Sequence, residues 1–332
     1  MSDAASPVFD GKQFKAWLSD LAGLETHTAR RYELEVALDP ANGLLEVEGT
    51  VSLAPAAPPG PPAPPAPPPP PGLLAQEARF LLSPGLEIAA PESGDRPAAL
   101  RRVPLAPGQT ELRLAYRGRL PGPWITPASS ELTLHNLWFP LFSVRPLPFT
   151  FRVLVRVPQD SVTAAGGRLV PLPPHLRPRV HDHTAPRAYL WESAGPTTDI
   201  AICSGPYLVH QRQLGPLTLE VFTLGDDFEL GQPCLDWMER ILACLTTWSS
   251  PLEVPDLASD AAVGAPARLG LIITPESIVG GYSRPGHIVL PRPMAAGVLD
   301  PAEEQSVALW LAHEMEHQWF GGLAGYLEEG PS

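Results

Sequence analysis

The sequence predicts an α+β protein in which a β-sandwich comes first and a mixed region of helices and strands follows. From Tyr32 to about residue 210, short apolar runs alternate with polar residues at a period of two, and proline and glycine interrupt them. After residue 210, apolar residues return at helical spacing. We therefore expect a helical leader over 1–27, a β-sandwich domain over 28–210 and a second domain over 211–332.

The individual elements are predicted from the same patterns. The leader ends in a short amphipathic helix with Phe14, Trp17, Leu18 and Leu21 on its apolar side. Strands are expected over 32–38, 45–53, 112–116, 149–157, 189–191 and 200–202 in the first domain, and over 217–221, 269–273 and 287–290 in the second. The second domain also contains a predicted helix over 234–248 and a last helix of about 20 residues. For this last helix, Asp300-Pro301-Ala302-Glu303 is typical of a capping box, and Gly321-Gly322 is typical of a C-terminal stop.

Residues 55–71 interrupt the strands with 12 prolines in 17 positions. Proline cannot donate ladder hydrogen bonds, so the segment is expected to leave the sheet in an extended polyproline II form. Such a segment can dock on an aromatic groove of another protein, or it can be a tolerated surface insertion. The lack of flanking basic residues favours the insertion.

Composition narrows the classes of protein. The chain has 332 residues, 44% of them hydrophobic, and a net charge of −13, which argues against a nucleic-acid partner. No apolar run is long enough for a membrane span, and the N-terminus lacks the pattern of a secretory signal. Three cysteines, Cys203, Cys234 and Cys244, are an odd and sparse set. We expect reduced thiols and a cytoplasmic protein.

The last predicted helix carries His313-Glu314-x-x-His317. Histidines at i and i+4 lie on one helix face, so both imidazoles can bind one zinc ion, and Glu314 lies where it can polarise a zinc-bound water. Apolar residues at helical spacing surround the motif, so the helix is expected to hold a buried metal site. Ser306, Leu309, Trp310, His313, His317 and Phe320 fall near one face.

The stretch His313-Glu314-x-x-His317-Gln318-Trp319-Phe320-Gly321 resembles the zinc helix of the aminopeptidase N-like gluzincin metallopeptidases. The resemblance covers roughly residues 28–332. It implies a saddle-like N-terminal β-sandwich, followed by the first part of a thermolysin-like catalytic domain. It also implies one zinc ion per chain, His313 and His317 as ligands, Glu314 as general base, and a peptide as substrate.

The chain departs from this family at the strand that binds substrate. The family carries Gly-x-Met-Glu-Asn before the zinc helix, and the glutamate there grips the free α-amine of the peptide. The corresponding residues are Gly280, Gly281, Tyr282, Ser283 and Arg284. We expect this stretch to bind substrate, although it could also be a simple turn. A serine cannot make the charge-assisted contact, and Arg284 would repel an ammonium group, so specificity for a free N-terminus is in doubt.

The expected position of the third zinc ligand in the sequence also differs from that of the family. At the family's spacing it would fall beyond Ser332, but Leu327-Glu328-Glu329-Gly330 resembles a shortened form of the motif that carries it. Glu329 is the expected ligand and Glu328 the alternative. We expect a truncated zinc metallopeptidase with weak or no activity, whose site a second chain or a missing C-terminal region would complete. The alternative is a catalytically impaired relative that serves as a binding or scaffold module.

Overall fold

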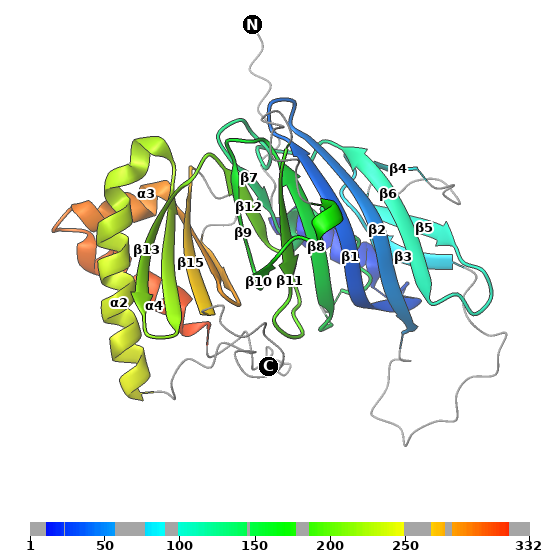
Figure 1. Cartoon of the computed structure of the whole chain (residues 1–332). Coiled ribbons are helices and arrows are strands. Elements are labelled where there is room, and N and C mark those ends of the chain that lie inside the picture. Colours follow the sequence, from blue (N-terminus) through cyan, green and yellow to red (C-terminus); the bar gives the residue numbers. More distant parts are fainter. Residues whose placement is uncertain are drawn as a thin grey trace, which may run out of the picture.

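A computed structural model describes residues 11–22, 24–56, 77–89, 99–144, 147–176, 186–248, 267–275 and 281–318. Within these residues the chain has a mixed α+β fold, which confirms the predicted class. Figure 1 shows a large β-rich unit beside a smaller unit in which helices and strands pack together. We call them the N-terminal unit, up to residue 205, and the second unit, from residue 208.

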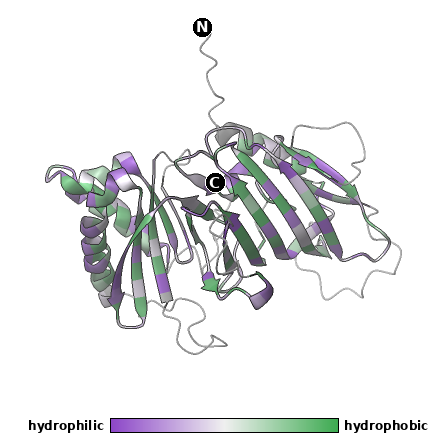
Figure 2. Ribbon diagram, turned by 45° about the horizontal axis from the view of Figure 1, so that its top comes forward, coloured by the Kyte–Doolittle hydropathy of each residue, from purple (hydrophilic) through white to green (hydrophobic). Residues whose placement is uncertain are grey.

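The N-terminal unit is built around a seven-stranded sheet. Its order is β10 (Arg168–Val170), β11 (Arg187–Glu192), β8 (Thr150–Val157), β1 (His27–Asp39), β2 (Leu44–Pro55), β6 (Glu111–Gly118) and β4 (Leu86–Ile88). Neighbouring strands are antiparallel except for β1 and β8. Along β1, Tyr32, Leu34, Val36 and Leu38 are buried, as the period of two predicts. The strands accordingly alternate between hydrophobic and hydrophilic residues in Figure 2.

Two smaller sheets and a helix complete this unit. The sheets are β7 (Ser130–Leu132), β12 (Ile202–Gly205) and β9 (Val162–Ala165), and β3 (Glu77–Leu81) with β5 (Leu100–Pro104). Helix α1 (Gly11–Leu21) buries Trp17 and Leu21, and two short 3-10 turns are η1 (Leu134–Asn136) and η2 (Pro174–Leu176). One continuous apolar cluster joins α1 to the sheets, and its centre includes Trp138, whose indole N–H donates to the carbonyl of Ile200 at 3.0 Å.

The second unit is a five-stranded mixed sheet with helices packed on it. The sheet order is β13 (Leu208–Leu214), β14 (Leu217–Thr223), β15 (Ala267–Thr274), β17 (His287–Pro291) and β16 (Tyr282–Arg284). The pairs β14–β15 and β15–β17 are parallel. The helical elements are η3 (Gly225–Leu230), α2 (Gly231–Trp248), α3 (Arg292–Ala295), η4 (Ala296–Leu299) and α4 (Glu304–Glu316). Helix α2 lies between β14 and β15 in sequence, which makes a βαβ unit.

The two units meet along an apolar contact between the three-stranded sheet and the β16–β17 hairpin. Ala201 and Cys203 from the first unit join Tyr282 and Val289 from the second in one buried cluster. The chain changes sheets between β12 and β13. The hairpin therefore contacts both the N-terminal unit and the helices of the second unit.

Two further predictions concern the proline-rich stretch and the absence of a membrane span. Strand β2 ends at Pro55, and most of the proline-rich stretch 55–71 lies outside the described residues. Among the helices that the structure describes, none is long and apolar enough to cross a membrane.

Candidate metal centre and substrate strand

The helix that carries the histidine motif is shorter than expected. Helix α4 begins at Glu304 and ends at Glu316 in the described part of the chain. Asp300 does not form the predicted capping box with Glu303, because its carboxylate accepts the amide of Ala302 at 2.9 Å and stabilises a turn before the helix. The helix therefore begins about one turn later than the sequence suggested.

The buried face of α4 is not the predicted one. Val307, Leu311 and Met315 enter the core of the second unit, whereas Leu309 is 68% exposed. His313 is exposed and His317 is half-buried. Helix α4 therefore packs mainly through the face that carries Val307, Leu311 and Met315, and not through the face that was expected to be buried.

His313 and His317 lie side by side, as their spacing requires. Their ring centres are 4.7 Å apart and the ring planes meet at 79°. Neutral imidazole is a preferred zinc ligand, so this pair of donors fits the metal. Within the described ranges, no group of three His, Cys, Asp or Glu side chains lies close enough to hold a metal ion. The expected third ligand, Glu329, and the alternative, Glu328, lie outside the described residues.

Glu314, which follows His313 directly, is 5% exposed. Burial raises the pKa of its carboxyl, and the nearby His317, His313 and Arg284 partly offset this effect. A carboxylate with a raised pKa is a better proton acceptor than an ordinary glutamate, which suits a general base. Along this turn of α4, His313 is thus exposed, Glu314 is buried and His317 is half-buried.

The predicted substrate strand lies against this helix. Gly281 comes just before β16, and a Cβ atom built on it would lie 1.5 Å from the indole of Trp310 on α4. Only glycine lets the strand come so close to the helix. Tyr282 is buried in the contact between the two units, and Ser283 Oγ accepts a hydrogen bond from Gln318 Nε2 at 2.6 Å. Gly280 lies outside the described residues.

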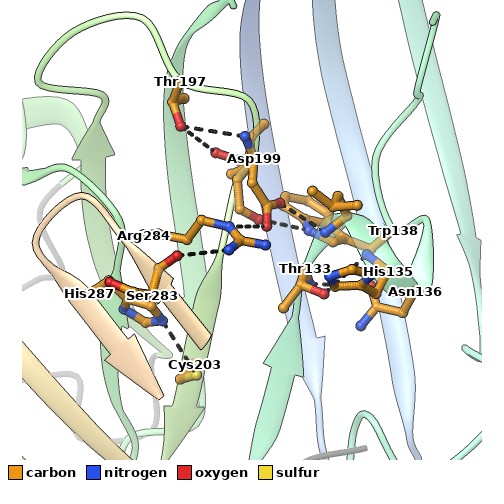
Figure 3. A network of polar contacts seen from close by, with 12 residues as sticks. Thr133, His135, Asn136, Trp138, Thr197, Asp199, Cys203, Ser283, Arg284 and His287 are labelled. Atoms are coloured by element: carbon orange, nitrogen blue, oxygen red, sulfur yellow. Dashed lines mark hydrogen bonds and ion pairs between the residues drawn. The ribbon is translucent and has the colours of Figure 1, made fainter. Parts of the chain in front are cut away.

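Arg284 is directed to the N-terminal unit rather than to the substrate strand's open side (Figure 3). Its Nε donates to Asp199 Oδ2 at 2.8 Å, and its Nη1 donates to the carbonyl of Ser283 at 2.7 Å. The Asp199 side chain is fully buried, and its Oδ1 accepts the amide of Leu134 at 2.8 Å. Asp199 thereby compensates the positive charge of Arg284, which was expected from the sequence to repel an ammonium group.

Sequence reasoning missed several groups around this hairpin. Gln318 and Asp199 make polar contacts to it, and sequence reasoning gave neither a role: Gln318 was noted only as part of the motif that resembles the zinc helix. His287 is fully buried, its Nε2 lies 3.8 Å from Cys203 Sγ (Figure 3), and desolvation lowers its pKa to about 3. Glu131 lies opposite Cys203 across the β7–β12 ladder and is also buried. No sequence pattern links these residues, because they come from different strands.

No protein-family model matches this chain, and no curated protein matches it.

Proposed function

We propose that this chain carries the zinc-binding helix and substrate strand of a zinc metallopeptidase of the aminopeptidase N-like type. The observation that carries the proposal is the arrangement on α4: two adjacent imidazoles on the open face and a buried glutamate with a raised pKa between them in sequence. The resemblance of the motif in sequence supports the same interpretation.

His313 and His317 would hold the metal, with Glu329 as the third ligand and Glu328 as the alternative. Bound zinc would supply Lewis-acid polarisation of the water and of the scissile carbonyl. Glu314 accepts a proton from the attacking water and donates it to the leaving amine as the C–N bond breaks, so no net proton is gained or lost.

The substrate strand would bind the peptide. Among the described strands, β16 lies at the edge of its sheet, next to β17 only. An extended peptide can add to such an edge through main-chain hydrogen bonds. Ser283 supplies no negative charge there, so we propose that the enzyme does not depend on a free α-amine.

We propose a cytoplasmic setting on the basis of cysteine usage. The three cysteines are all free thiols, and Cys203 and Cys234 are buried. None of them is paired as expected for an oxidising compartment.

One observation favours the alternative of a binding or scaffold module. His313 is exposed, and within the described residues the imidazole pair has no third ligand beside it. A helix with two surface histidines can bind a partner or a weakly held metal without catalysis.

Zinc content and peptide hydrolysis test the proposal together. Elemental mass spectrometry should find about one zinc per chain in the wild type, and much less in His313→Ala and Glu329→Ala. The exposed His175, on η2, gives a matched control, and His175→Ala should keep the zinc. Glu314→Gln should keep the zinc and lose hydrolysis of a peptide substrate.

The result that contradicts the metal site is a wild type with no more zinc than His313→Ala. Stoichiometric zinc with no hydrolysis by the wild type would favour the scaffold alternative. Hydrolysis that survives Glu314→Gln would remove Glu314 from the mechanism.

A further inference from the structure

Gln318 connects the end of the zinc helix to the substrate hairpin through three hydrogen bonds. Its side chain follows His317 directly and is 8% exposed. Its Oε1 accepts the amide of Gly286 at 2.8 Å, and its Nε2 donates to Ser283 Oγ at 2.6 Å and to the carbonyl of Arg284 at 3.1 Å.

The partners fix the orientation of the Gln318 amide. A backbone N–H can only donate and a backbone carbonyl can only accept, so the oxygen must face Gly286 and the nitrogen must face Arg284. If the amide were reversed, its oxygen would face the carbonyl oxygen of Arg284 and its nitrogen would face the N–H of Gly286. An acceptor would then meet an acceptor, and a donor would meet a donor. A buried amide with all three contacts made is well determined in position.

The hairpin turn that Gln318 holds is also tied to other elements. Pro285 and Gly286, with φ +73° at Gly286, have the residues and backbone typical of a type II turn between β16 and β17. The Gly286 carbonyl accepts the amide of Gly270 on β15 at 3.0 Å, and the Pro285 carbonyl accepts the amide of Gly167 at 3.3 Å. The turn is therefore attached to the sheet and to the N-terminal unit, and Gln318 attaches it to the zinc helix.

We propose that Gln318 is a positioning residue that fixes the substrate strand relative to Glu314 and the two histidines. The catalytic part of this inference rests on the proposed peptidase function. Ser283 lies on the strand and Gln318 next to His317, so loss of the three bonds would let strand and helix shift against each other. A misplacement of about 1 Å between substrate and base can lower a rate about a hundredfold.

The test uses Gln318→Met, because the methionine side chain has a similar length but lacks the amide that makes the three hydrogen bonds. We expect kcat for peptide hydrolysis to fall about ten- to a hundredfold, with a smaller change in KM and with zinc content unchanged. Gln213→Met is the matched control, because the Gln213 amide also holds a hairpin turn, donating to the carbonyls of Gly215 and Leu217 between β13 and β14, at the edge of the sheet opposite β16. It should lower kcat less than about threefold.

A second measurement does not depend on activity. Amide hydrogen exchange, followed by NMR, should become about tenfold or more faster at Gly286 in Gln318→Met, and should stay unchanged at Val36 on β1. Unchanged exchange at Gly286 would overturn the attachment, whatever the activity. Faster exchange with an unaltered kcat would overturn the positioning role. An inactive wild type would favour the scaffold alternative but leave the exchange result to decide whether Gln318 holds the hairpin.

Discussion

Strand β1 and helix α4 differ in where their glutamate side chains lie. From Tyr32 to Leu38 on β1, every second residue is apolar and buried, and glutamates such as Glu33 lie on the open face. On α4 a glutamate, Glu314, is buried while Leu309 is exposed. Burial of an ionisable group at the expense of an apolar one costs stability, so it persists where it has a functional purpose. The comparison teaches that β1 follows the pattern of a half-buried strand throughout Tyr32 to Leu38, and that α4 departs from the pattern of an amphipathic helix at Glu314, the residue on which the proposed function depends.

The prediction with the largest expected effect concerns the ion pair between Arg284 and Asp199, and tests whether this buried pair stabilises the fold around the β16–β17 hairpin. Arg284→Met leaves the fully buried Asp199 without its ion pair and should lower the free energy of unfolding by about 3 kcal/mol or more. Arg152→Met is the control from the N-terminal unit, where the pair with Glu192 is partly exposed, and should cost less than about 1 kcal/mol. Urea denaturation measures both, and equal losses would contradict the distinction.

The next effect concerns shape rather than charge. Gly281→Ala places a methyl group inside the indole of Trp310 and should cost about 1–3 kcal/mol. Gly195→Ala is the control, because no atom lies within 4 Å of a Cβ there. If the collision is the cause, Trp310→Leu should make Gly281→Ala nearly neutral in a double-mutant cycle followed by denaturation. Additive losses would show that Gly281 has another role.

A smaller effect depends on pH. His287 has a pKa of about 3 in the fold against about 6.5 when unfolded, so the unfolded chain binds more protons between these values. Stability from the neutral imidazole is full above pH 6.5 and is lost as pH falls toward 3. Between pH 7 and 5.5 this residue should account for about 1 kcal/mol of lost stability. His287→Gln should show a correspondingly shallower loss, and an unchanged pH profile would contradict the assignment.

The prediction with the smallest expected effect compares an exposed and a buried leucine on α4. Leu309→Gln changes an exposed leucine and should alter the free energy of unfolding by less than about 0.5 kcal/mol. Leu311→Ala, two residues along the same helix, removes a buried side chain and should cost about 2–5 kcal/mol. A large loss at Leu309 would mean that this face is covered by another part of the chain or by a partner.

The fold was easier to predict than the site. Period-two alternation gave β1, β6 and β8, and helical spacing gave α2, because both patterns are local. The short strands β3, β5, β7 and β9 were missed, since three to five residues carry too little pattern. At the site, the sequence identified the histidine pair and Glu314, but it assigned the wrong face of α4 to the interior.

By itself, the sequence determined that the fold is α+β and that the imidazoles of His313 and His317 are neighbours, because backbone geometry alone brings residues four apart onto one face. Only the tertiary structure decided which face of α4 is buried and what surrounds the substrate strand. Asp199 and Arg284 are 85 residues apart in sequence, and Gln318 and Gly286 are 32 apart. Such contacts depend on how the sheets pack, and no local pattern encodes them.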